Sequence, residues 1–141
     1  MGYEFSASLT SSVTVANNGS VPFDNVTNLG RYDFSSGFYD ATTGIYTVNT
    51  GYLAEIFGKI KLASLLDSSQ FQLKGLTSGN IYAVIDLPSL ALGSVQDGDL
   101  PRLTLQLSFL DPTLEQIALI NTSGSSRTIL AGSYFGVIPL S

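Results

Sequence analysis

Hydrophobic and polar residues alternate along much of the chain with the period of two that is typical of β-strands. The clearest stretch is residues 103–107, Leu-Thr-Leu-Gln-Leu, and near residue 60 Ile60 and Leu62 alternate with two lysines. Other segments rich in β-branched and aromatic residues also predict strands. They cover residues 10–15, 44–48, 52–62, 71–75, 81–87, 117–120 and 134–140.

Short clusters of Gly, Asn, Asp and Ser separate these segments, as in the turn signal Asn17-Asn18-Gly19-Ser20. Helix signals are weak, because β-forming residues flank the one candidate turn of helix at residues 62–66. Several short strands joined by such turns predict a β-sandwich or barrel. No composition shift, linker or internal repeat divides the chain, so we expect a single domain over residues 1–141.

The chain contains no cysteine and no histidine. Serine–histidine and cysteine–histidine catalysis and zinc-activated water are thereby excluded, because histidine is the usual base and metal ligand. Chemistry by two carboxylates, as in glycoside hydrolysis, remains open. No pair of acidic residues stands out for that role, so we expect no enzyme, no catalytic residue and no organic cofactor, and a carbohydrate-active enzyme ranks as a distant third reading.

Six basic and eleven acidic residues give a net charge of −5, which argues against nucleic-acid binding. No apolar run is long enough to cross a bilayer, so no membrane insertion is expected. Charged residues make up 12% of the chain, about half of the usual share. A lone domain of this size exposes roughly 7,000 Å², or about one charge per 400 Å². Such a surface predicts that another copy of the chain covers part of it.

The most specific pattern lies between residues 21 and 52. Val21-Pro22-Phe23-Asp24-Asn25-Val26 is followed by Tyr32-Asp33, then by residues 39–48 (Tyr-Asp-Ala-Thr-Thr-Gly-Ile-Tyr-Thr-Val), then by Gly51-Tyr52. This order resembles the globular head domain of the complement C1q family, which shares the jelly roll of tumour necrosis factor. In that family a Tyr-Asp-x-x-Thr-Gly turn leads into a strand with a central aromatic residue.

Both ends of the chain extend the resemblance. Phe5-Ser6-Ala7 is similar to the family's opening Phe-Ser-Ala, and residues 133–140 are similar to its closing Ser-x-Phe-x-Gly-Phe-Leu-Leu strand. The family's Gly-Asp before the penultimate strand is absent from residues 111–117, and Gly98-Asp99 lies one strand too early.

The resemblance implies an antiparallel jelly-roll sandwich of about ten strands, assembled as a homotrimer. It also implies a secreted or surface-exposed recognition head that binds a protein or glycan, in some members behind a collagen-like stalk. Bacterial and phage relatives of this fold suit the Ser- and Thr-rich composition, which leaves a structural role as a spore-coat or fibre-tip protein as the alternative. The resemblance also implies that Thr43-Gly44 of this chain supply the tight backbone of a hairpin.

Aromatic residues are the candidates for the binding or trimer interface. A dense cluster around residue 37 could form an exposed ligand platform, although packing across the trimer axis is the favoured interpretation. Two tyrosines near residue 50 are expected to point inward or into an interface, and two aromatics belong to the closing strand. The candidates are Tyr32, Phe34, Phe38, Tyr39, Tyr46, Tyr52, Tyr134 and Phe135.

Asp97-Gly98-Asp99 has the carboxylate spacing of a calcium loop. The twelfth position from Asp97 is Ser108 where a closing glutamate belongs, so a solvated turn is favoured and calcium stays an open candidate. The acidic residues of the family motif (Asp24, Asp33 and Asp40) are expected to bind turn amides. The isolated Arg31, Arg102 and Arg127 could anchor an acidic partner, but solvation or ion pairing is favoured.

Overall fold

The computed structural model describes residues 5–27, 37–48, 52–64, 67–89, 96–107 and 115–139. Twelve β-strands and no helix occur within these ranges, so no helix there could cross a membrane. The strands are β1 (Phe5–Ser8), β2 (Val13–Val15), β3 (Asn25–Thr27), β4 (Gly37–Asp40), β5 (Ile45–Val48), β6 (Tyr52–Leu62), β7 (Ser69–Gly75), β8 (Ile81–Leu87), β9 (Gln96–Leu107), β10 (Gln116–Asn121), β11 (Arg127–Ile129) and β12 (Tyr134–Pro139).

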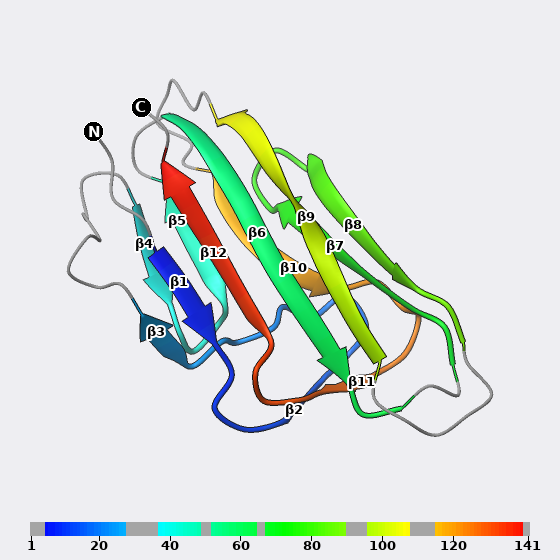
Figure 1. Ribbon diagram of the computed structural model, residues 1–141. Helices are drawn as coiled ribbons and strands as arrows, with labels where there is room; N and C mark the ends of the chain where they lie inside the picture. The colour runs from blue at the N-terminus through cyan, green and yellow to red at the C-terminus, as the bar shows by residue number, and fades with distance from the viewer. Residues whose placement is uncertain are drawn as a thin grey trace.

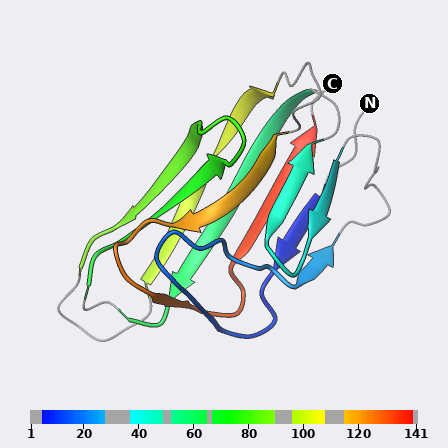
Figure 2. The ribbon, with the colours of Figure 1, turned by 180° about the vertical axis from the view of Figure 1, so that it is seen from behind.

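The strands form two antiparallel sheets that face each other (Figure 1). The seven-stranded sheet has the order β2-β11-β6-β12-β1-β3, and β9 pairs with the other side of β6 along almost its whole length. The five-stranded sheet has the order β4-β5-β10-β7-β8 and is seen from its outer side in Figure 2. The neighbours in both sheets are often distant in sequence, as expected for a jelly roll.

Side chains alternate between the core and the surface, as the sequence pattern predicts. Along β7, Phe71 and Leu73 are fully buried, whereas Gln70 and Gln72, which alternate with them, face outward. On β6, Ile60 and Leu62 are buried in the same way. The two sheets therefore enclose one apolar core, whose largest members include Phe23, Tyr46, Phe71 and Phe135.

Gly98 of β9 marks a close contact with strand β8 of the other sheet. A Cβ atom added at Gly98 would lie 2.6 Å from side-chain atoms of both Ile85 and Leu87. The missing side chain thus lets the two edge strands approach along this side of the sandwich.

Two turns have the backbone that their residues favour. Asn18 adopts a left-handed conformation with φ of 67°, and Gly44 does so with φ of 78° in the turn between β4 and β5. The amide of Gly44 donates to the carbonyl of Asp40 at 2.8 Å, and the side chain of Asp40 accepts the amide of Thr42 at 2.8 Å. The role expected for Thr43-Gly44 as a tight hairpin turn is thereby confirmed.

Candidate functional site

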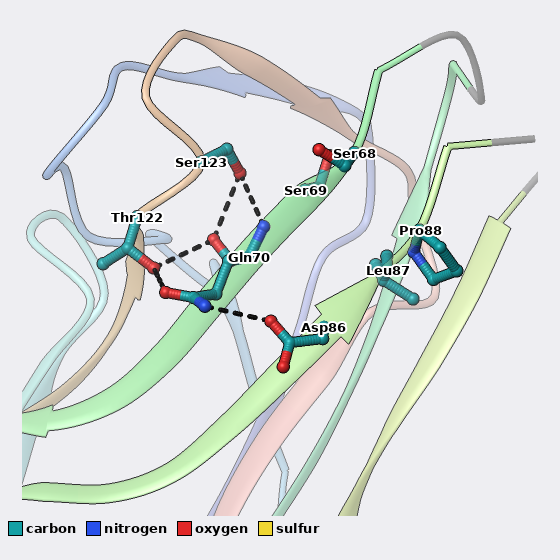
Figure 3. A pocket seen from close by; sticks show the side chains of 8 residues that line it. All are labelled: Ser68, Ser69, Gln70, Asp86, Leu87, Pro88, Thr122 and Ser123. Carbon is teal, nitrogen blue, oxygen red and sulfur yellow. Dashed lines mark hydrogen bonds between the residues drawn. The ribbon is translucent and has the colours of Figure 1, made fainter.

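A polar cleft of about 480 Å³ opens at one end of the sandwich. Its walls come from the first residues of β7, the last residues of β8 and the segment after β10 (Figure 3). This volume falls in the range of about 300–1,000 Å³ typical of ligand pockets. The lining residues are Ser68, Ser69, Gln70, Asp86, Leu87, Pro88, Thr122 and Ser123.

The segment after β10 is tied to β7 by hydrogen bonds to the backbone of Gln70. The Ser123 hydroxyl accepts the Gln70 amide at 2.9 Å and lies 3.1 Å from the Gln70 carbonyl, to which it donates. The Thr122 amide donates to the same carbonyl at 2.8 Å. Two walls of the cleft are therefore fixed relative to each other.

The side chain of Gln70 connects these walls to the carboxylate of Asp86 on β8. Its Oε1 accepts the Thr122 hydroxyl at 2.9 Å and the Gln72 amide group at 3.2 Å. Its Nε2 donates to Oδ1 of Asp86 at 2.9 Å (Figure 3). Oδ2 of this exposed carboxylate accepts no hydrogen bond from any described residue. The chain therefore orients Asp86 and leaves one of its oxygens for a ligand.

Arg127 lies behind the wall formed by the two serines. Its Nε donates to the Ser69 hydroxyl at 2.7 Å, and its Nη2 donates to the Ser68 carbonyl at 2.8 Å. Its Nη1 donates to the Ser126 carbonyl at 2.9 Å and to the Ser125 hydroxyl. All four acceptors are neutral groups, and the guanidinium brings a positive charge close to the cleft.

A second, smaller cleft of about 180 Å³ opens on the other side of Arg127. It also contains Asp67, an exposed carboxylate, and is bounded by the end of β6 and by β11. Asp67 lines the same cleft as Arg127, whereas Asp86 lines the larger cleft, so each cleft contains an exposed carboxylate. This arrangement offers a matched pair of positions for experiments.

The carboxylate of Glu115 forms a separate buried polar cluster at the opposite tip of β7 and β8. Glu115 is 1% exposed and accepts the amides of Thr77 and Ser78 at 3.2 Å each, the Ser78 hydroxyl, and the Tyr82 hydroxyl at 2.7 Å. Burial raises the pKa of Glu115, but these hydrogen bonds outweigh it and hold the pKa below its ordinary value. Burial and the bond to Glu115 raise the pKa of Tyr82. With no space left for a ligand, this cluster is structural.

Three of the predicted interface aromatics lie inside the single chain. Tyr46 is 1% exposed and Phe135 is fully buried, so neither presents a surface to a partner. Tyr39 is partly buried; its ring lies 6.4 Å from that of Phe135, and its hydroxyl donates to the Phe23 carbonyl at 2.9 Å. Burial raises the pKa of Tyr39 well above its ordinary value. These three residues pack the core, since the alternation of strands β4, β5 and β12 turns them inward.

Tyr134 differs from them because 36% of its surface is exposed. Its ring lies 6.1 Å from that of Phe57 on the outer face of the seven-stranded sheet. Gly136, two residues after Tyr134 on β12, stands opposite Phe57 in the strand register and carries no side chain. The two rings therefore form an aromatic surface on the outer face of this sheet.

The remaining aromatic candidates fall where side chains are not described. Phe38 and Tyr52 belong to β4 and β6, but only their backbone is placed. Tyr32 and Phe34 lie outside the described residues, as do Asp33 and Arg31. Their interface roles stay predictions.

The expectation of a turn at Asp97-Gly98-Asp99 is wrong. The segment is part of strand β9, where Asp97 pairs with Lys61 and Asp99 pairs with Lys59. Pairing with β6 and the close approach of β8 at Gly98 hold these residues in an extended conformation. The side chains of Asp97 and Asp99 are not described, so calcium binding by them stays a prediction.

The aspartates of the family motif bind backbone amides where they are described. Asp24 accepts the amide of Thr10 at 3.0 Å and also its hydroxyl, and these bonds lower the pKa of Asp24. Asp40 accepts the amide of Thr42, as noted above. The prediction that these aspartates bind turn and loop amides is confirmed at both positions.

The cleft could not be foreseen from the sequence. Its residues come from three segments near positions 69, 87 and 122, which only the folded sheet brings together. Gln70 and Gln72 alternate with apolar residues in the sequence, and this alternation could have marked the outer face of β7 as polar. Nothing in the sequence showed which polar residues of other strands would meet it.

Comparisons with known proteins identify the architecture. No protein-family model matches the chain, and no curated protein matches it. The Eiger TNF of S. frugiperda superposes with a TM-score of 0.71 at 14% identity, covering 99% of this chain and 91% of that one. The globular domain of zebrafish complement 1qA gives 0.66 at 14% identity, with 99% and 98% covered.

Murine APRIL at pH 5.0 gives a TM-score of 0.63 at 9% identity, covering 99% of this chain and 100% of that one. Identities this low establish a common fold and nothing finer. The sheet order and these superpositions together show that the chain has the C1q/TNF-like jelly-roll fold.

Proposed function

We propose that the chain is a non-enzymatic recognition head that acts outside the cell, assembles as a homotrimer and binds a protein partner. The observation that carries this proposal is the exposed aromatic surface of Tyr134 and Phe57 on the outer face of the seven-stranded sheet. The likeness of the fold to TNF, complement C1q and APRIL supports it. The resemblance to the C1q family implies trimers around a threefold axis.

Tyrosine is among the residues that dominate protein interfaces, because it buries a large rigid ring and keeps a polar hydroxyl. Gly136, which stands opposite Phe57, is buried beside the pair, so the two rings themselves present the surface that a partner would meet. Charged residues make up 12% of the chain, so much of its surface can be buried without removing charges from water.

A second exposed apolar group lies on the β7–β8 hairpin and consists of Leu76, Ile81 and Val84. It is separate from the aromatic pair, which lies on the other sheet. Contacts between two different surfaces of identical chains are heterologous, and they close into a ring when the rotation fits. Three copies with identical loops would then bind a partner multivalently, which raises the overall affinity beyond that of one site.

The experiment is sedimentation equilibrium at several concentrations, with and without a chelator. We expect the mass of three chains, and we expect Tyr134→Asp to shift the equilibrium toward single chains by at least about tenfold in the association constant. Ala131→Asp is the matched control, since it adds the same charge at an exposed turn three residues away. A single-chain mass at every concentration would contradict the trimer, and a loss on chelation would show that calcium supports it.

A further inference from the structure

We propose that the cleft between the start of β7, the end of β8 and the segment after β10 binds a neutral carbohydrate, with Asp86 as the main hydrogen-bond acceptor. The inference goes beyond the proposed trimer. Every residue that lines the cleft belongs to one chain, so the site would be present in a single chain as well.

The cleft contains a carboxylate, that of Asp86, which the chain holds in a fixed orientation. Gln70 holds Oδ1 of Asp86 at 2.9 Å and is itself held by Thr122 and Gln72. Because both lone pairs of Gln70 Oε1 are used by protein donors, the carboxamide cannot rotate freely. Oδ2 of Asp86 remains a charged acceptor at a fixed position, and charge-assisted hydrogen bonds are the stronger kind.

Hydroxyl groups also line the cleft. Ser68 has no hydrogen-bond partner for its hydroxyl among the described residues, and the Thr122 hydroxyl donates inward while its oxygen can still accept. Hydroxyls both donate and accept, as do the hydroxyls of a sugar. A cleft that combines one fixed acceptor with such groups matches a ligand carrying several neighbouring hydroxyls.

The charges around the cleft select the charge of its ligand. Arg127 donates to the Ser69 hydroxyl and the Ser68 carbonyl, so a positive charge lies behind the serine wall of the cleft, and Asp86 brings a negative charge to its lining. An anionic ligand is attracted by Arg127 and repelled by Asp86. A cationic ligand is repelled by Arg127 and attracted by Asp86. A neutral ligand gains the hydrogen bonds without either repulsion. The cleft therefore favours a neutral polyol over an acidic sugar or a basic side chain.

One side of the cleft is apolar. The exposed ring of Pro88 closes one side of the cleft, next to Leu87, whose side chain is 6% exposed and packs mainly into the core (Figure 3). A pyranose ring carries C–H groups on one face and hydroxyls around its edge. A few fixed polar groups beside such a wall are the usual composition of a small-molecule site.

The test is saturation-transfer NMR of the full chain with methyl glycosides of glucose, galactose, mannose, fucose and N-acetylglucosamine and with their short oligosaccharides. N-acetylneuraminic acid and N-acetyl-lysine amide are the charged comparison probes. We expect a saturable signal from at least one neutral sugar at millimolar concentration, and a larger affinity for an oligosaccharide would identify the ligand as a unit within a chain.

Asp86→Ala should weaken that binding about tenfold or more, because it removes a charge-assisted acceptor. Asp67→Ala is the matched control, since it removes the exposed carboxylate on the other side of Arg127, and it should leave the affinity unchanged. Neither aspartate is buried, so amide spectra should show both variants folded. No signal from any neutral sugar, a signal only from the lysine amide, or equal losses in both variants would overturn the inference.

Discussion

The hydroxyl of Tyr82 donates a hydrogen bond of 2.7 Å to the carboxylate of Glu115, a residue 33 positions away that is almost completely buried. Together with the amides of Thr77 and Ser78, this bond ties the tip of the β7–β8 hairpin to the start of β10. Gly75 leaves the space, because a Cβ atom there would lie 2.5 Å from a Glu115 oxygen.

Glu115→Gln should lower the free energy of unfolding at pH 7 by about 1–3 kcal/mol, because a charged acceptor of several donors is lost. The folded-state pKa of Glu115 is lowered, so its contribution is complete above the unfolded-state pKa of about 4.3 and is lost as the pH falls through the folded-state value. Urea unfolding of both proteins between pH 7 and pH 3 should show the difference shrinking toward acid. A difference that grows toward acid would contradict the assignment.

Tyr82→Phe should cost about 1 kcal/mol, since it removes one hydrogen bond and keeps the ring. Combined with Glu115→Gln, the two losses should be less than additive, because both variants break the same bond. Thermal or urea unfolding of the four proteins gives the coupling energy. Full additivity would show that the two groups do not interact in solution.

Gly44→Ala should destabilise the chain more than Gly79→Ala. Both glycines have a positive φ, 78° and 80°, so both variants carry the strain of a left-handed alanine, about 1–2 kcal/mol. A Cβ at Gly44 would also lie 2.1 Å from the Val21 carbonyl oxygen, whereas no atom lies within 4 Å of one at Gly79. This overpacking should add about 1–3 kcal/mol. Equal melting temperatures for the two variants would refute the close contact.

Asn121→Ala should cost about 2–3 kcal/mol, since the buried amide of Asn121 donates to the carbonyls of Val15 and Ser125 at 3.0 Å each. Its oxygen also accepts the amide of Ser123 at 3.0 Å. Urea unfolding measures the loss, with Asn25→Ala as the control at an exposed asparagine that holds one long bond of 3.4 Å. Similar losses at both positions would contradict the central role of Asn121.

The longer strands could be predicted from sequence because one face of each is buried. Strand β7 follows its alternation residue by residue. The short strands β4 and β11 were missed, since Gly37–Asp40 and Arg127–Ile129 lack the run of three β-branched residues that marks β2 at Val13–Val15. The first part of β9 was missed for another reason: Asp97-Gly98-Asp99 has turn composition, but pairing with β6 and contact with β8 overrule that local preference.

The candidate site could not be predicted in the same way. Aromatic residues were the expected site, yet Tyr46 and Phe135 lie in the core, because their strand phase and not their type decides which side they face. Asp86, Gln70 and Thr122 meet through pairing of strands that are distant in sequence. Such pairing follows from the order of the strands, which the local pattern does not contain.

The register of β1 against β12 has a practical consequence. Phe5 stands opposite Val137, so β1 begins beside the end of β12, whereas β7 begins and β8 ends at the opposite end of the sandwich (Figure 1). A dye, a fusion partner or a sensor surface coupled ahead of β1 or behind β12 would be held at the edge remote from Asp86. Immobilised chains would thus display their clefts to the solution, which suits this fold to surface-based screening.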